Sequence, residues 1–282
     1  MSTADVSTAG TGLAPGADEA ARTASRRANR SGWFINGARV LLLIIVWLLW
    51  WAAAANHWVS TLILPTPGAT WHTLVTVSKN GTLFSNAGVT LEAAAIGFVI
   101  GMTAGVLIGF AVGLSLTLTG VVSPFIVVLN SLPRIALAPM FVLWFGVGNA
   151  SGVALVVSLV FFIALTNTIS GTQSVERSHL RLVQLYGANR LQITSKVVLP
   201  ATVPWIVAAA RLSLANALAG AIVSEMFLGQ NGLGFMIVSG SGVFDTSQVF
   251  AAIIAALVIA AILDRIGTLL EKHLLRWRPS EV

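Results

Sequence analysis

The stretch YGANRLQITSKVVLPATVPWI, residues 186–206, is the longest segment beyond the N-terminal region that is not plainly apolar. It places two cations, Arg190 and Lys196, between two hydrophobic blocks. Gly187 stands near its start, and Pro200 follows that glycine by thirteen residues. A polar insert with a glycine and a proline at such definite positions indicates a specific turn rather than an ordinary loop.

The insert predicts two short helices. The first is expected over 173–186, with Ser174 as its N-cap. Gly187 is expected to end it in the left-handed conformation, which glycine adopts without steric cost. The second helix is expected from about Asn189 to Val198.

Leu199-Pro200 is predicted to stop the second helix, since proline lacks the amide hydrogen that an interior position needs. Pro204 would then fall in the first turn of the next membrane span, where proline is tolerated. Two helices joined at an elbow would project from the membrane, and this shape suits docking into a groove on another protein.

Composition places the whole chain in a membrane. Of its 282 residues, 56% are hydrophobic and 9% are charged, and the mean hydropathy is +0.87. A soluble domain has roughly 25% charged residues, so an integral membrane protein is predicted. The chain has no cysteine, which excludes disulfides and thiolate metal sites. Its net charge of +6 admits nucleic-acid binding, or an excess of cations on cytoplasmic loops.

Six segments are long enough, at about 20 apolar residues, to cross a bilayer as helices. They are 38–56, 88–114, 118–145, 150–171, 203–227 and 247–270. The sequence therefore predicts an all-α protein with six transmembrane helices. In the outer loop 57–87, Pro65 and Pro67 are expected to break any helix, and the residues after Gly68 are expected to lie on the outer interface.

Lysine and arginine orient these spans. The tail before the first span, the insert at 172–202 and the C-terminal end together hold thirteen of the sixteen cations. The opposite, outer loops are 57–87, 146–149 and 228–246, and they hold only Lys79. The positive-inside rule therefore places both termini and the insert in the cytoplasm and explains the net charge without nucleic acid. Residues 1–32 are expected to be a disordered cytosolic tail, and 33–282 a transmembrane domain with cytoplasmic helices at about 173–202.

The second span carries a glycine stripe, with glycine at every fourth position. The residues are Gly97, Gly101, Gly105, Gly109 and Gly113. On a helix they form one flat face that lets another helix approach closely. We expect packing within the chain, with a dimer face as the alternative.

The third span is interrupted by Pro124, Pro133 and Pro139, and Asn130 and Arg134 lie between them. Freed carbonyls and a cation at membrane depth are tolerated inside protein or beside a water-filled cavity. Two interpretations stand equally: this segment lines a solute pathway, or it is a kinked helix whose arginine contacts a neighbour.

Nothing in the sequence indicates catalysis or a metal site. The four histidines are scattered, and no serine stands in a Gly-x-Ser-x-Gly setting. The three lysines follow Ser, Ser and Glu, so no Gly-Lys-Ser/Thr phosphate loop exists. Transport would be ion-coupled, passive, or driven by ATP that a partner hydrolyses. The carboxylates Glu92, Glu225 and Asp264 all fall near span ends, which disfavours ion coupling.

The insert resembles half of a family motif. Gly187, Val197, Leu199 and Pro200 match the Gly-x9-Ile-x-Leu-Pro part of the EAA loop of ATP-binding-cassette (ABC) importer permeases, with Val for Ile. The segments LPTPGATWHTLV, SLPRIALAPMFVLWFGVG and AARLSLANALAGAIVSEMFLGQNGLGFMI look like the nitrate, sulfonate and taurine branch. The resemblance covers about 33–272 and implies a type I importer permease in the inner membrane.

The resemblance also implies partners. These are two cytosolic ATPases, which bind the ATP and Mg, a second permease copy in a homodimer, an extracytoplasmic solute-binding protein, and membrane lipid. This chain would bind no cofactor, metal or nucleic acid and would have no catalytic residue. ATPase coupling is expected at Arg181, Gly187, Ala188, Arg190, Val197, Leu199 and Pro200. The family's Glu-Ala-Ala aligns with Arg181-Leu182-Val183, so a basic arginine stands in place of the acidic glutamate.

The solute is expected to be a small anion, such as a sulfonate, nitrate, taurine or an organic acid. The expected pathway residues are Asn130, Arg134, Arg211 and Glu225. Arg211 has a second interpretation, because it lies two turns into the fifth span and can extend to the cytosolic surface. An ion-coupled carrier or channel that works without an ATPase is the alternative function.

Overall fold

A computed structural model describes residues 37–56 and 58–276, and every regular element in these ranges is a helix. The predicted tail at 1–32 lies outside the described residues. The chain divides into two compact units. The first, up to Ser60, contributes one apolar helix, Gly37–Ala55, in which only 6% of the most apolar window is buried.

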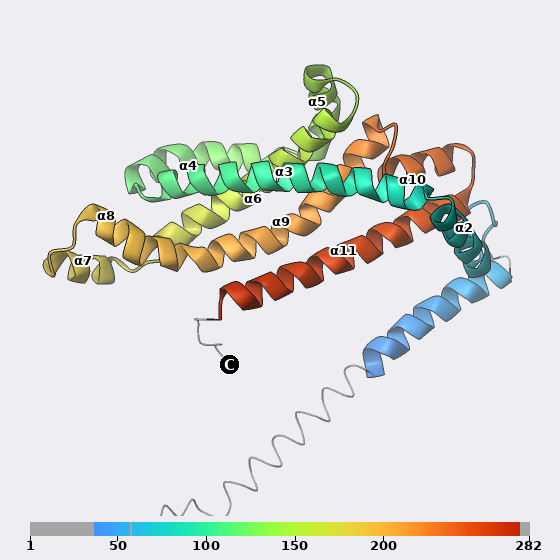
Figure 1. Cartoon of the computed structure of the whole chain (residues 1–282), viewed down its shortest axis with the longest axis horizontal. Coiled ribbons are helices and arrows are strands. Elements are labelled where there is room, and N and C mark those ends of the chain that lie inside the picture. Colours follow the sequence, from blue (N-terminus) through green and yellow to red (C-terminus); the bar gives the residue numbers. More distant parts are fainter. Residues whose placement is uncertain (1–36, 57, 277–282) are drawn as a thin grey trace, which may run out of the picture. The chain divides into compact units, whose positions relative to one another are not determined.

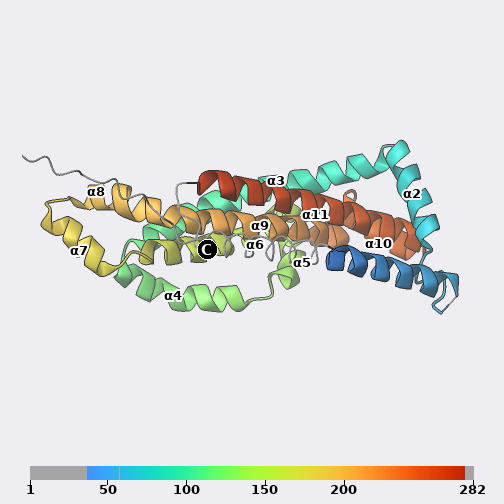
Figure 2. The same cartoon turned by 90° about the horizontal axis from the view of Figure 1, so that it is seen from below.

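The second unit, Thr61–Val282, holds the helices that Figure 1 labels α2 to α11. They are α2 (Pro67–Lys79), α3 (Thr82–Gly113), α4 (Leu116–Ser131), the 3-10 turn η1 (Arg134–Leu137), α5 (Ala138–Phe145), α6 (Asn149–Gln173), α7 (Arg177–Leu185), α8 (Arg190–Ile193), the π-helical turn η2 (Thr194–Val198), α9 (Leu199–Leu228), α10 (Leu233–Gly242) and α11 (Thr246–Leu274). The long helices α3, α6, α9 and α11 run lengthwise beside one another (Figures 1 and 2).

The predicted spans are confirmed. Five described helices are long and apolar enough to cross a membrane, and the number is six if the bent pair α4 and η1–α5 is counted as one span. The fifth span is longer than expected, because α8, η2 and α9 form one helix over Arg190–Phe227. At 1.5 Å per residue, such a helix exceeds the roughly 30 Å of a bilayer core. One end of it therefore extends beyond the membrane.

The glycine stripe of α3 packs within the chain. A Cβ added to Gly97 would lie 2.5 Å from Val156 Cβ, and one added to Gly101 would lie 2.9 Å from Val160 Cβ. At Gly105 the corresponding atom is Ala164 Cβ, at 2.6 Å. The partners advance along α6 with the same four-residue step, so α3 and α6 run parallel in close contact. This confirms the intramolecular packing face.

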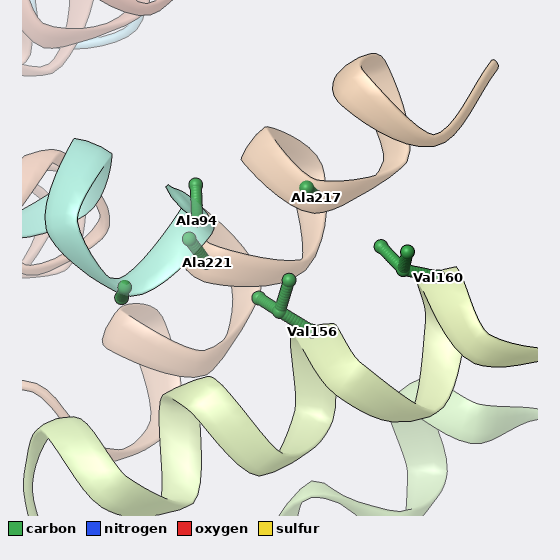
Figure 3. Packing of buried hydrophobic residues seen from close by; sticks show 6 residues of the cluster. Ala94, Val156, Val160, Ala217 and Ala221 are labelled. Carbon is green, nitrogen blue, oxygen red and sulfur yellow. The ribbon is translucent and has the colours of Figure 1, made fainter. Parts of the chain in front are cut away.

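Helix α9 packs antiparallel against α6 and also contacts α3. Glycines again mark the contacts, since Gly152 faces Ser224 and Gly171 faces Trp205. Small and branched side chains fill the space between the three helices. Figure 3 shows this cluster, which consists of Ala93, Ala94, Val156, Val160, Ala217 and Ala221. The cluster fixes α6 as the central helix of the bundle.

Helices occupy parts of two predicted outer loops. No described helix continues through Pro65 and Pro67, as predicted, and Pro67 begins α2, because the first helical position needs no amide donor and Thr66 caps the helix by accepting the Ala69 N–H. The segment after α9 was expected to be an outer loop, yet it contains α10. Leu233 and Met236 of α10 are buried against Leu83 of α3 and Ala252 of α11, and this packing stabilises a helix too short to span a membrane.

Candidate functional site

The elbow has the predicted glycine turn. Gly187 adopts a φ of +83° between α7 and α8. Its N–H donates to Gln184 O at 2.9 Å, and the Ala188 N–H donates to Val183 O at 3.3 Å. The second of these bonds spans five residues and is the 6→1 bond of a Schellman motif. This motif satisfies the last carbonyls of α7. No atom of the described chain lies within 4 Å of a Cβ added at Gly187, so backbone conformation and not crowding requires the glycine.

The second arm of the elbow starts at a capping box. Asn189 Oδ1 accepts the Gln192 N–H at 2.8 Å, and Gln192 Oε1 accepts the Asn189 N–H at 2.9 Å. Both bonds satisfy amides that a helix start leaves unpaired. The predicted start at Asn189 is confirmed, and the cap fixes where α8 leaves the elbow.

Ser174 does not cap the first arm, and this prediction was wrong. Helix α6 runs to Gln173, and Ser174 is its C-cap, with its hydroxyl donating to Gly171 O at 2.7 Å. Helix α7 begins at Arg177, after Glu176 in the N-cap position. The first arm is therefore shorter than 173–186, because the end of the fourth span occupies its predicted start.

Pro200 does not stop the second arm, which continues into α9. The preceding turn widens instead: Thr194–Val198 is π-helical, and the Leu199 N–H donates to Thr194 O, five residues back. A π turn moves the carbonyls out of α-helical register, which removes the clash that proline makes with residue i−4. Pro204 consequently lies inside α9 and not in the first turn of a new helix.

The elbow presents exposed apolar side chains. The elbow tip, defined here as Leu182, Leu185, Tyr186 and Leu191, includes two residues that are 85% exposed, Leu185 and Tyr186. Of the predicted coupling residues, Arg181, Gly187, Arg190, Leu199 and Pro200 are exposed, while Ala188 and Val197 are half-buried. Sequence reasoning missed the elbow tip, although the alternation of cations with leucines around 177–191 is the amphipathic signal for it.

The broken span brings Asn130 and Arg134 together. Helix α4 and the segment η1–α5 meet at 78°, and the break falls at Leu132-Pro133. The Arg134 guanidinium donates to Asn130 Oδ1, and its Cζ lies 4.4 Å from the ring centroid of Phe162 on α6. Phe162, which the sequence did not single out, lies near the midpoint of α6. This contact is compatible both with a segment that lines a pathway and with a kinked helix whose arginine contacts a neighbour.

Arg211 lies elsewhere, between α9 and α11. Its guanidinium pairs with Glu271 at 2.8 Å and with Asp264 at 3.4 Å. Gly267, between these two carboxylates on α11, lets the Arg211 side chain lie against the helix: a Cβ added there would be 3.4 Å from Arg211 Cγ. The structure does not bring Arg211 into contact with Arg134.

Glu225 is buried at the end of the bundle opposite the elbow. Its Oε2 accepts bonds from Thr90 Oγ1 and from the Gly234 N–H, both at 2.9 Å. Asn86 Oδ1 accepts the Gly232 N–H at 2.6 Å. These bonds tie the segment between α9 and α10 to α3. Gly232 has a φ of +108°, and a side chain there would meet the Glu225 carboxylate.

A cavity of about 280 Å³ lies beside this network. Its lining includes two acidic residues, Glu92 and Glu225, and the amides Asn149, Gln230 and Asn231. Among the residues that the structure describes, no group of three or more His, Cys, Asp or Glu side chains is arranged to hold a metal ion.

A bundle of apolar spans, one of them broken, with an elbow at one end, defines a membrane transport subunit. The chain belongs to the family described as "Binding-protein-dependent transport system inner membrane component", whose model matches residues 97–276.

Relatives support the same assignment. An aliphatic sulfonates transport permease protein of Bacillus subtilis, SsuC, is 34% identical over 79% of this chain and 80% of its own length. The taurine transport permease protein TauC of Escherichia coli is 29% identical over 78% and 82%. The riboflavin transport permease protein RibX of Chloroflexus aurantiacus is 32% identical over 77% and 81%.

Solved structures share the fold. An inward-facing MetNI methionine ABC transporter gives a TM-score of 0.55 at 18% identity, covering 68% of this chain and 94% of the other. An amino acid ABC transporter gives 0.58 at 18% identity, covering 71% and 97%. The chain is thus a multi-pass inner-membrane permease subunit of an ABC importer, with the all-α type I fold. It is a transport subunit and not an enzyme, and its family works with an ATPase and a binding protein.

Proposed function

We propose that the elbow is the docking element for a cytosolic ATPase, at Arg181, Gly187, Ala188, Arg190, Val197, Leu199 and Pro200. The observation that carries this proposal is the exposed elbow tip beside a rigid glycine turn. Leucine and tyrosine exposed on a short projecting helix suit a groove on a partner protein. ATP and Mg would be bound by that partner and not by this chain.

The continuous helix over Arg190–Phe227 supports a direct route for movement. A partner that pulls the elbow pulls α8, and α8 is one rod with the fifth span. Because α9 packs along α6, the pull would reach the centre of the bundle. Alternating access in a homodimer with two ATPases is proposed to use this coupling. The elbow and both termini would lie in the cytoplasm, as the cation distribution indicates.

The solute is proposed to be a small anion of the sulfonate, nitrate or organic-acid kind, delivered by an extracytoplasmic binding protein. The names of two relatives, for aliphatic sulfonates and taurine, support this class. A third relative is named for riboflavin, so resemblance alone does not select the solute. The pathway is proposed to follow the broken span at Asn130 and Arg134.

Reconstitution tests the energy source. In proteoliposomes, the chain alone should show neither ATP hydrolysis nor uphill uptake, and both should require its partner ATPase and the binding protein. Uptake by the chain alone, driven by a proton or sodium gradient, would instead establish the ion-coupled carrier.

A further inference from the structure

The two arginines inside the predicted spans differ in charge balance. Arg211 contacts two carboxylates, Asp264 and Glu271, so its charge is more than neutralised. Arg134 forms no ion pair with any described residue. The two cations therefore have different tasks, although the sequence alone treats them alike.

The contacts of Arg134 leave its charge uncompensated. Asn130 supplies a neutral amide oxygen, and Phe162 supplies the face of an aromatic ring at 4.4 Å. The Nε atom is buried and has no hydrogen-bond partner among the described residues. A ring face and an amide attract a cation weakly compared with a carboxylate. A counter-charge is therefore missing from the described part of this subunit.

The position of Arg134 makes the missing counter-charge significant. Phe162 lies near the midpoint of α6, so the guanidinium lies beside the middle of a helix long and apolar enough to cross a membrane. A cation at this depth faces protein or a water-filled cavity and marks a solute pathway. The break at Leu132-Pro133 places irregular backbone beside it, which is also tolerated only against protein or a cavity.

We propose that Arg134 is the anion-binding group of the solute pathway, with Asn130 and Phe162 holding its guanidinium in place. A planar guanidinium donates parallel hydrogen bonds to a carboxylate or sulfonate group, and the ring of Phe162 restrains its plane. Arg211 is assigned a structural task between α9 and α11. This inference deepens the proposed function, since it requires that this chain forms the pathway.

Thiol chemistry tests the proposal without knowledge of the natural solute, because the chain contains no cysteine. Asn130→Cys places one thiol beside Arg134 in the full chain, reconstituted in lipid nanodiscs. The probes are (2-sulfonatoethyl) methanethiosulfonate, an anion, and (2-trimethylammonioethyl) methanethiosulfonate, a cation. Arg134 should raise the anion-to-cation rate ratio at this thiol, relative to the ratio that the same two reagents give with free cysteine.

The decisive comparison removes the charge. Arg134→Gln in the Asn130→Cys background should lower the rate ratio about tenfold, equivalent to about 1.4 kcal/mol. Arg265→Gln is the matched control: it removes an exposed arginine of α11 that takes part in no described ion pair, and it should leave the ratio unchanged. If Asn130→Cys fails to fold, Ser131→Cys places the thiol on the same turn.

Two outcomes would overturn the inference. A thiol that reacts with neither reagent would show that the site is not open to water. A rate ratio that Arg134→Gln leaves unchanged would show that a carboxylate of a second copy already neutralises the guanidinium. Neither measurement uses the ATPase, so this result is independent of whether ATP-driven uptake is found.

Discussion

Glu225 on α9 and Thr90 on α3 are joined by a buried hydrogen bond of 2.9 Å, and the same carboxylate oxygen accepts the Gly234 N–H at the start of α10. The Thr90 hydroxyl oxygen also accepts the Leu233 N–H at 2.9 Å. Two side chains thus hold the first turn of α10 in a buried position, where its amides have no water to bond with.

Replacing this carboxylate should destabilise the subunit. Glu225→Ala leaves the Gly234 N–H without its acceptor, at about 1–3 kcal/mol for a buried unsatisfied group, whereas the Thr90 hydroxyl keeps Asn86 O as an acceptor at 3.1 Å. Glu225→Gln keeps an oxygen in place and should cost much less. The measurement is the thermal unfolding midpoint of the purified subunit in detergent. Glu92→Gln, at an exposed position of the same cavity, is the control. Equal midpoints for Glu225→Ala and the control would contradict the assigned network.

The glycine stripe predicts a sharp difference between two glycines of one helix. A Cβ at Gly105 would lie 2.6 Å from both Ala164 Cβ and Phe161 O, whereas a Cβ at Gly88 meets nothing within 4 Å. Gly105→Ala must separate α3 from α6, and overpacking of this kind typically costs about 1–3 kcal/mol. Gly88→Ala should be neutral or slightly stabilising. Monodisperse yield after detergent extraction would distinguish them, and equal yields would refute the packing.

Gly187 is expected to control assembly rather than folding of the spans. Its φ of +83° costs a residue with a Cβ about 1–2 kcal/mol. A larger side chain would also project from the elbow into the proposed ATPase groove. Gly187→Leu should therefore leave membrane expression near normal and lower both ATPase co-purification and uptake, with Gly187→Ala milder. Gly187→Asn separates the two causes, because asparagine tolerates this conformation better than alanine. Full co-purification by the leucine variant would exclude the elbow as the coupling element.

Arg181 stands where the EAA motif of the family has a glutamate, and substituting it tests whether this difference affects assembly. Its side chain is exposed on α7, so a partner surface of neutral or acidic character is expected opposite it. Arg181→Glu should weaken assembly with this ATPase, toward the lower end of the roughly 1.5–7 kcal/mol measured for close charge pairs at interfaces. Arg181→Gln is the control, with an intermediate effect. The affinity of the permease for the ATPase in detergent gives the answer, and tighter binding by the glutamate variant would show that the arginine serves no partner.

Much of the fold follows from local chemistry. Apolar length predicted the six spans, because a bilayer requires about 20 apolar residues for each. Glycine at every fourth position predicted which face of α3 packs against another helix. Small residues at this spacing lie on one side of a helix and let a second helix approach closely. Gly187 and Asn189 predicted the elbow, because a left-handed turn and a helix cap are decided by neighbouring residues.

The rest was decided by tertiary structure. Pro200 reads locally as a stop, yet packing of α9 along α6 stabilises one long helix, and a π turn accommodates the proline. Arg134 and Arg211 look equivalent in the sequence, and only the positions of α6 and α11 give one a ring and the other two carboxylates. The period and caps of a helix are properties of its own residues, whereas the charge balance of a side chain depends on which distant helices lie beside it.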